Sequence, residues 1–119
     1  MFRYHSLPGK STVAELTDEL FTINDPHDAL DLLADLGNNS CDRIIIKENN
    51  LSPDFFDLNT GLAGEILQKF SNYRVRLAVI GDFSKYKSKS LQDFIRECNR
   101  LQMILFTGSL DFALEKMGK

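Results

Sequence analysis

The spacing of apolar residues predicts alternating strands and helices along most of the chain. Apolar positions three and four residues apart predict a helix over residues 26–36, which Asp25 and Pro26 begin and Gly37 ends. An unbroken apolar run, Ile44-Ile45-Ile46, then lies between charged residues. Such a run is typical of a strand that is covered on both faces, as in a parallel sheet.

The same alternation continues through the middle of the chain. Ser52 is placed to begin a single helical turn that ends near Phe56, and Asn59 or Thr60 is placed to cap a second helix. The apolar stripe of that helix consists of Leu62, Ala63, Ile66, Leu67 and Phe70. A second buried strand is predicted over residues 74–80, the most apolar strand candidate in the sequence.

The last third predicts one more strand between two helices. Ser88 or Ser90 is placed to cap the third helix, a strand follows over residues 103–106, and Ser109 caps the final helix. The first residues are less regular. A strand at residues 2–5, a Pro-Gly turn at residues 7–10 and a returning strand at residues 11–16 predict a hairpin, with a short extension at residues 19–23.

The resulting order is β-β-α-β-α-β-α-β-α, which predicts an α/β fold. Strands joined by helices favour a mostly parallel sheet flanked by helices, with the first strand antiparallel at an edge. A chain of 119 residues without an internal repeat or a linker is expected to form a single domain over residues 1–119.

The amino-acid composition and net charge narrow the classes of protein to which the chain can belong. The apolar share of 43% is enough for a hydrophobic core, and the net charge of −3 disfavours a nucleic-acid binder. No stretch approaches the roughly 20 apolar residues of a membrane helix, and the first residues do not resemble a signal peptide. Cys41 and Cys98 lie far apart in no metal-binding spacing. We therefore expect a reduced, cytoplasmic protein without a disulfide.

One segment resembles the STAS fold of anti-sigma-factor antagonists. In that family a D-S-S-G-L-G-like string opens the second helix, and its first Ser accepts phosphate. The matching string here runs from Leu58 to Ala63, with Asn59 at the phosphoacceptor position and Thr60 at the second Ser. Gly61 and Leu62 match the family. Because Asn cannot be phosphorylated, the resemblance implies the fold and a partner-binding role but not that switch.

Almost the whole chain resembles an uncharacterised bacterial family, domain of unknown function forty-one-eighty. The similarity is carried by residues 28–32, 55–58, 60–70 and 72–75, by Gly81-Asp82-Phe83, and by residues 88–91 and 93–95. The family name implies no activity. The resemblance therefore supports the predicted fold and leaves the function to be inferred from the residues.

Three loops are expected to meet beyond the carboxyl ends of the strands, where α/β proteins gather functional groups. They are residues 48–50, 57–61 and 82–85. The second loop precedes a helix, whose free N–H groups suit an anion. The predicted ligand-binding or partner-binding residues are Asp57, Asn59, Thr60, Gly61, Asp82, Ser84 and Lys85.

Simpler interpretations of these residues stay open. Asn59 or Thr60 can cap the helix, and Asp57 and Asp82 can bond loop amides rather than form a carboxylate pair for a metal ion. The aromatic residues Phe55, Phe56, Phe83 and Tyr86 can plug the end of the core or, if exposed together, mark a partner surface.

The sequence carries no enzymatic signature. His5 and His27 are the only histidines, and no catalytic triad, phosphate loop or metal-ligand spacing includes them. We predict a non-enzymatic, STAS-like interaction or regulatory module with no catalytic residue, metal or cofactor. The alternative is a protein, or a weak enzyme, that binds a small ligand or anion at Asn59–Gly61. An edge strand at residues 2–5 also offers a surface for a homodimer.

Overall fold

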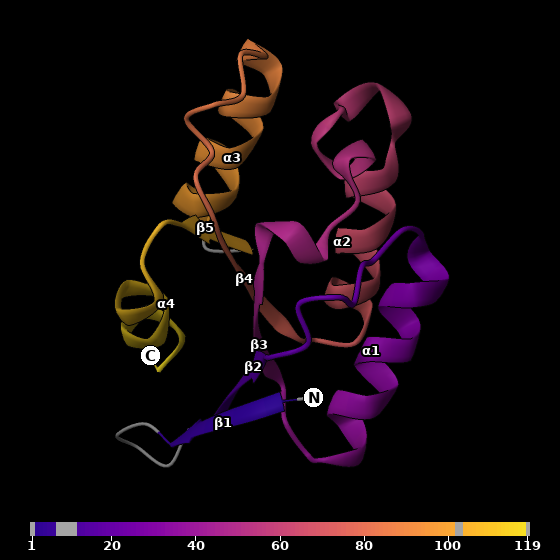
Figure 1. Cartoon of the computed structure of the whole chain (residues 1–119), viewed down its shortest axis with the longest axis vertical. Helices are drawn as coiled ribbons and strands as arrows, with labels where there is room; N and C mark the ends of the chain where they lie inside the picture. The colour runs from indigo at the N-terminus through magenta and orange to yellow at the C-terminus, as the bar shows by residue number, and fades with distance from the viewer. Residues whose placement is uncertain (1, 7–11, 102–103, 119) are drawn as a thin grey trace.

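A five-stranded mixed sheet forms the centre of the protein and has helices on both faces (Figure 1). The computed structural model describes residues 2–6, 12–101 and 104–118. The strands are β1 (Phe2–Ser6), β2 (Thr12–Leu16), β3 (Arg43–Lys47), β4 (Arg76–Ile80) and β5 (Ile104–Thr107), and they lie side by side in chain order. β1 is antiparallel to β2, as predicted for the edge strand, and the other neighbouring pairs are parallel.

The helices are α1 (Pro26–Asn38), α2 (Leu62–Asn72), α3 (Lys89–Leu101) and α4 (Leu110–Met117). Three short 3-10 helices, Glu48–Asn50, Pro53–Phe56 and Leu58–Thr60, lie between β3 and α2. The order of strands and longer helices along the chain is the predicted one. The predicted turn at residues 7–10 lies outside the described residues, as do positions 11 and 103 at the starts of two predicted strands.

The sequence signals for helix starts operate largely as predicted. The Asp25 carboxylate accepts a hydrogen bond of 2.9 Å from the Asp28 N–H, and Pro26 occupies the first turn of α1. The hydroxyls of Ser88 and Ser109 accept hydrogen bonds from the N–H groups of Leu91 and Phe112. These side chains satisfy backbone donors that have no partner inside the helix.

Several predicted boundaries were wrong, including the ends of β1 and β5, which each lie one residue later than predicted. Gly37 does not end α1, which continues to Asn38 because Ser40 takes the left-handed conformation that turns the chain. β4 begins at Arg76 rather than at position 74, because Arg74 has a positive φ and closes the turn after α2. The N-cap of α2 is Gly61, at φ 75°, rather than Asn59 or Thr60. A left-handed residue at that point favours glycine.

The alternation of side chains divides the core between the two faces of the sheet. Ala14, Ile44 and Leu77 point to the face covered by α1, α2 and α3, where the larger hydrophobic cluster lies. Val13, Ile45 and Ala78 point to the other face, where α4 contributes Ala113 and Met117. Figure 1 shows α4 on the side of the strands away from α1 and α2. Ile44, Ile45 and Ile46 are all fully buried, as their unbroken apolar run predicts.

Candidate functional site

The predicted loop around Thr60 is held together by its own hydrogen bonds. The Thr60 hydroxyl lies 2.9 Å from both the Asp54 and the Asp57 carbonyl oxygens and accepts a hydrogen bond of 3.1 Å from the Leu62 N–H. The Asp57 carboxylate accepts a hydrogen bond of 3.1 Å from the Asn59 N–H. Thr60 therefore bonds the first N–H of α2 from one residue before the N-cap, although it is not the N-cap that the sequence predicted.

The second predicted loop is also bonded internally. The Asp82 carboxylate accepts hydrogen bonds from the Ser84 hydroxyl at 2.6 Å and from the Ser84 N–H at 3.1 Å, and these bonds lower the pKa of Asp82. The Lys85 ammonium lies 2.7 Å from the Glu48 carboxylate. Asp57 and Asp82 thus both bond amides of their own loops. Anion binding at Asn59–Gly61 stays a prediction.

Glu48 joins two of the three predicted loops, a role that sequence reasoning missed. Its carboxylate pairs with Lys85 and accepts a hydrogen bond from the Tyr86 hydroxyl. Burial and this hydrogen bond raise the pKa of Tyr86. Gly81 permits the approach, because a Cβ at that position would lie 2.6 Å from the Glu48 Cβ. The available sequence signal was a charged residue directly after one strand and a glycine directly after the neighbouring strand.

The loop aromatic residues plug the end of the core, which is one of the two predicted alternatives. Phe55 is fully buried, and Phe56 stacks on Tyr86 with ring centroids 4.8 Å apart. Phe83 lies between Phe56 and Phe106, with centroids at 6.1 and 5.3 Å. The stack ties residues 53–56, before α2, to residues 83–86, before α3. We call the three predicted loops, residues 48–50, 57–61 and 82–85, the rim. Their polar groups and the neighbouring aromatic side chains bond and pack mainly on one another and show no convergent catalytic set.

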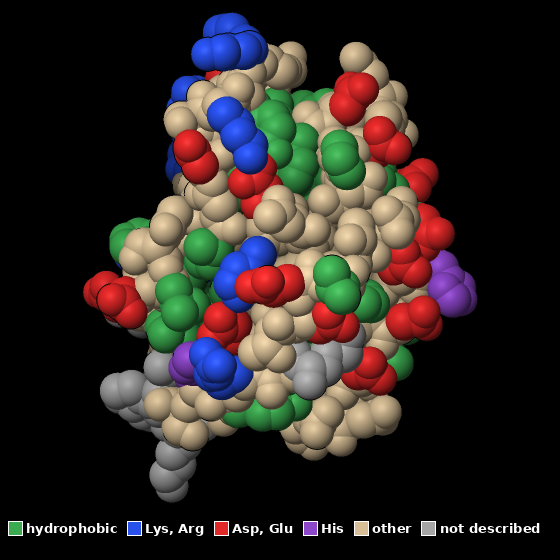
Figure 2. All heavy atoms as spheres, in the orientation of Figure 1, with side chains coloured by type: hydrophobic (Ala, Val, Ile, Leu, Met, Phe, Trp, Pro, Cys, Tyr) green, Lys and Arg blue, Asp and Glu red, His purple; other side chains and the backbone are tan. Residues whose placement is uncertain are grey.

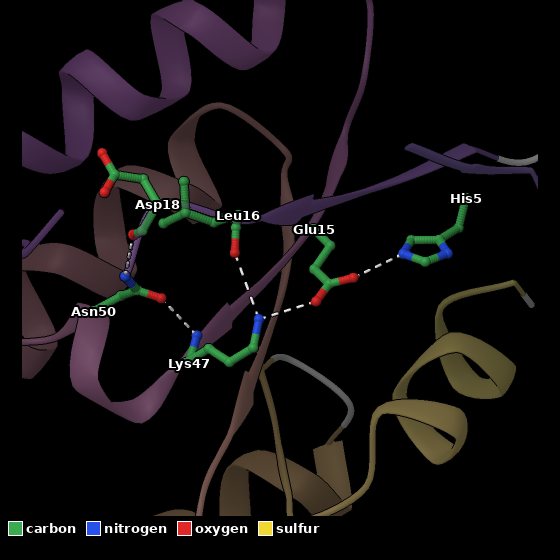
Figure 3. Close-up of polar contacts among 6 residues, drawn as sticks. All are labelled: His5, Glu15, Leu16, Asp18, Lys47 and Asn50. Carbon is green, nitrogen blue, oxygen red and sulfur yellow. Dashed lines mark hydrogen bonds and ion pairs between the residues drawn. The ribbon is translucent and has the colours of Figure 1, made fainter. Parts of the chain in front are cut away.

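A polar cluster on the α4 face was also missed from the sequence (Figure 3). The buried Glu15 carboxylate lies 2.9 Å from the His5 ring and 3.0 Å from the Lys47 ammonium. Burial alone would raise the pKa of Glu15, but the hydrogen bonds and charges of His5 and Lys47 together lower it. Glu15 thereby links β1, β2 and β3, and its partners fit a structural ion cluster.

Asn50 extends this polar network toward the loop before α1. Its side-chain oxygen accepts a hydrogen bond of 2.9 Å from the Lys47 N–H, and its amide donates to the carbonyl oxygens of Asp18 and Phe21 (Figure 3 shows Asp18). Only 1% of Asn50 is exposed, so all of these bonds are made away from bulk water. The arrangement anchors a loop and leaves Asn50 no spare group for a ligand.

The described residues contain one group of carboxylates and imidazole close enough together to hold a metal ion. Asp25, His27 and Asp28 present ligand atoms within 4.8 Å of one another at the start of α1. The two aspartates already bond backbone N–H groups, Asp25 to Asp28 and Asp28 to Asn24, and His27 is exposed. This arrangement is that of a capped helix start.

An apolar furrow lies between α2 and α3 on the three-helix face. It encloses about 510 Å³. Its lining, called here the α2–α3 furrow, is Gly64, Leu67, Gln68, Ser71, Val75, Phe94, Glu97, Cys98 and Ile104. Figure 2 shows a group of hydrophobic side chains between the upper ends of α3 and α2, and the residues of the furrow itself are those named above. α2 begins directly after the predicted loop 57–61, and α3 begins at Lys89, shortly after the predicted loop 82–85.

Comparison with known proteins identifies a family but no function. A family model described as "Domain of unknown function (DUF4180)" matches residues 9–117. No curated protein and no solved structure matches the chain. In the part of the chain that the structure describes, no helix has the length and apolar character needed to cross a bilayer. The match covers more than half of the chain, and the protein therefore belongs to the DUF4180 family.

Proposed function

We propose that this protein is a non-enzymatic, STAS-like interaction module, and that a partner protein lays an apolar helix face into the α2–α3 furrow. The observation that carries the proposal is the furrow itself, an apolar surface bounded by two helices. Its volume of about 510 Å³ is lined mainly by apolar side chains, including Leu67, Val75 and Phe94. Contiguous exposed apolar surface marks interaction sites in soluble proteins.

The wall that α2 gives to the furrow has the form of a helix-packing surface. Gly64, Leu67, Gln68 and Ser71 lie at positions i, i+3, i+4 and i+7, which places them on one side of the helix. A Cβ at Gly64 would meet no atom within 4 Å beyond its own helix backbone and chain neighbours. The small Gly64 and Ser71 therefore leave room for ridges of an incoming helix, the geometry of helix-in-groove recognition.

The wall that α3 gives to the furrow combines apolar side chains with a polar border. Phe94 and Cys98 line the interior, and Glu97 lies at the border, where it pairs with Arg100. A polar border around an apolar centre is the usual anatomy of a protein interface. Binding there would bury surface without requiring any residue to react.

The state of the predicted loop residues supports binding over catalysis. Thr60, Asp57 and Asp82 bond loop backbone, and Lys85 pairs with Glu48. Groups with satisfied partners make poor acids, bases or nucleophiles but hold a surface in shape. The same loops precede α2 and α3, so a change in either loop would reach the furrow. We propose that this connection supplies the regulatory part of the function.

The cellular setting and the symmetry of the protein are part of the proposal. Cys41 and Cys98 are buried free thiols, which supports a reducing compartment such as the bacterial cytoplasm.

β1 is the outermost strand on its side of the sheet, beside β2 alone, which supports a homodimer formed through this edge. Light scattering during size-exclusion chromatography measures the mass in solution, and a value near 13.5 kDa would contradict the dimer.

Site-specific photo-crosslinking tests the interaction. A photoreactive phenylalanine analogue at Gln68, on the border of the furrow, is expected to capture a protein in cells that express the chain naturally. Mass spectrometry should locate the linked peptide in an amphipathic helix of that protein. The matched control carries the same analogue at Ala34, an exposed position on α1. Equal capture from both positions, or linkage to segments without an apolar helical face, would contradict the proposal.

A further inference from the structure

β5 ends the sheet on the side away from β1 and, among the described strands, pairs with β4 alone. The outer edge of such a strand presents backbone N–H and C=O groups to which another strand can bond. The Thr107 carbonyl oxygen accepts a hydrogen bond of 3.0 Å from the Gly81 N–H, so Thr107 faces inward, toward the end of β4. Because the bonding direction alternates along a strand, the N–H and C=O groups of Phe106 lie on the outer edge.

The side chain of Asn99 occupies this outer edge. Its oxygen accepts a hydrogen bond of 2.8 Å from the Phe106 N–H, and its nitrogen donates a hydrogen bond of 3.1 Å to the Phe106 carbonyl oxygen. Asn99 is half-buried and lies near the end of α3. One side-chain amide therefore makes both of the bonds that a neighbouring strand would make with Phe106.

The sequence around β5 is of the kind that pairs readily with other chains when a sheet edge is open. Residues 101–107, with the sequence LQMILFT, contain no charged residue, glycine or proline. Uncharged, largely apolar segments of about this length form sheets between chains. This segment brings no charge of its own to discourage such pairing, so the edge depends on another group for its protection.

The surface beside this edge also leaves room for an added strand. A hollow of about 310 Å³ lies there, and its lining includes Asn99, Phe106 and Phe112. Phe112, in α4, is 42% exposed, which makes it one of the few large hydrophobic side chains that stay well exposed. An extended segment laid along β5 would cover this apolar surface. The two hydrogen bonds from Asn99 are therefore the main obstacle to a strand at this edge.

We propose that Asn99 closes the β5 edge against a strand from a second copy of the chain, and that removal of its amide turns this edge into a self-association surface. A second copy is the partner that fits, because it presents the same uncharged segment and a two-fold axis brings two such edges together. The proposal concerns the edge farthest from β1, so it depends neither on the β1 dimer nor on the furrow proposed above.

Light scattering during size-exclusion chromatography tests the role of Asn99. Asn99→Leu keeps a similar volume but removes both hydrogen bonds, so its mean mass should reach at least about twice that of the natural chain in the micromolar range. Asn99→Ala should behave in the same way. Asn99→Asp keeps an acceptor for the Phe106 N–H and adds a charge that deters strand pairing, so its mass should equal that of the natural chain. The natural mass in folded Asn99→Leu and Asn99→Ala, or failure of both variants to fold, would overturn the proposal.

A matched control separates an opened edge from a general loss of stability. Ser109→Ala removes the hydroxyl that accepts a hydrogen bond from the Phe112 N–H and leaves Asn99 in place, so its mass should equal that of the natural chain. Hydrogen exchange locates the association, because in dilute Asn99→Leu the Phe106 amide should exchange at least about tenfold faster than in the natural chain and regain protection as the concentration rises. Association of Ser109→Ala to the same extent, or exchange at Phe106 that does not depend on concentration, would show that Asn99 does not guard this edge.

Discussion

The two faces of the sheet are covered unequally, and the space left on each face has a different chemistry. α1, α2 and α3 cover one face and bury a large apolar cluster, which leaves the apolar α2–α3 furrow between two of them. α4 alone covers part of the other face. That face carries Glu15 with its two partners, and toward the opposite end of β3 and β4 it carries Arg43 and Arg76.

This difference follows from the number of helices available for each face. Where a helix covers the strands, apolar side chains are buried and stabilise the fold by roughly 25 cal/mol per Å². On the other face, the charged side chains of Glu15, His5 and Lys47 stand on the sheet and stabilise one another. We therefore place the proposed apolar partner on the three-helix face.

The largest expected effect lies in the core of the three-helix face. Phe70→Ala removes a fully buried ring at the end of α2 and should lower the free energy of unfolding by about 3–5 kcal/mol. Chemical denaturation followed by circular dichroism measures the change. Tyr73→Ala, at an exposed position three residues later, should change stability by less than about 1 kcal/mol. Similar losses in both variants would show that this face is not the main source of stability.

The next largest loss of stability is expected on the α4 face, and its size depends on pH. Glu15→Gln should lower the free energy of unfolding at pH 7 by about 1–3 kcal/mol, because it removes the charge that His5 and Lys47 surround. The folded pKa of Glu15 is lowered, so its contribution is complete above the unfolded pKa and disappears as the pH falls through the folded pKa.

Denaturation curves at a series of pH values test this dependence. The difference in stability between the natural chain and Glu15→Gln should shrink below about pH 5. Glu19→Gln, at an exposed loop position, is the control and should show no such difference. A constant difference down to pH 3 would mean that the ionised Glu15 carboxylate does not stabilise the fold.

A smaller loss of stability should distinguish substitution of Thr60 from substitution of its neighbour Asn59. Thr60→Ala should lower the free energy of unfolding by about 1 kcal/mol, since the hydroxyl bonds the Asp54 and Asp57 carbonyl oxygens and the Leu62 N–H. Asn59→Ala should have little effect, because the exposed Asn59 side chain makes no hydrogen bond to the described residues. Thermal denaturation compares the two. A larger loss of stability for Asn59→Ala would show that Asn59, and not Thr60, stabilises the start of α2.

The smallest effect concerns the ion pair that joins two loops. Lys85→Met should lower the free energy of unfolding by less than about 1 kcal/mol, because Lys85 is 55% exposed and the Glu48 carboxylate keeps its hydrogen bond from Tyr86. The loss should decrease in 1 M salt, which screens exposed charges. Lys87→Met serves as the control. A loss above 2 kcal/mol would show that the Glu48 pair is essential to the rim.

The sequence predicted the elements well because their signals are local. The caps at Asp25, Ser88 and Ser109 and the apolar run at Ile44–Ile46 depend on residues close in the chain. The boundaries at Gly37 and Arg74 failed because a non-glycine residue took the left-handed conformation, at Ser40 in the first case and at Arg74 itself in the second. The contacts that stabilise these two turns form only in the folded protein, so no local sequence pattern predicts the turns.

The candidate sites were harder to predict because they depend on distant residues. Glu15 meets His5 and Lys47 only when three strands pair, and the α2–α3 furrow forms only when α2 and α3 lie side by side. The predicted rim was found from the rule that loops gather at the carboxyl ends of strands. That rule identified the loops before α2 and α3 but could not foresee the furrow between the helices.

The most direct test of the central claim places a bulky side chain in the α2–α3 furrow without disturbing the fold. At both Gly64 and Gly37 a Cβ meets no atom within 4 Å beyond the local helix, so leucine fits either helix and should improve its propensity. Affinity for the partner captured through Gln68 is then measured by isothermal titration calorimetry. The account predicts that Gly64→Leu weakens binding at least tenfold while Gly37→Leu binds like the natural chain. Undiminished binding by a folded Gly64→Leu variant would contradict it.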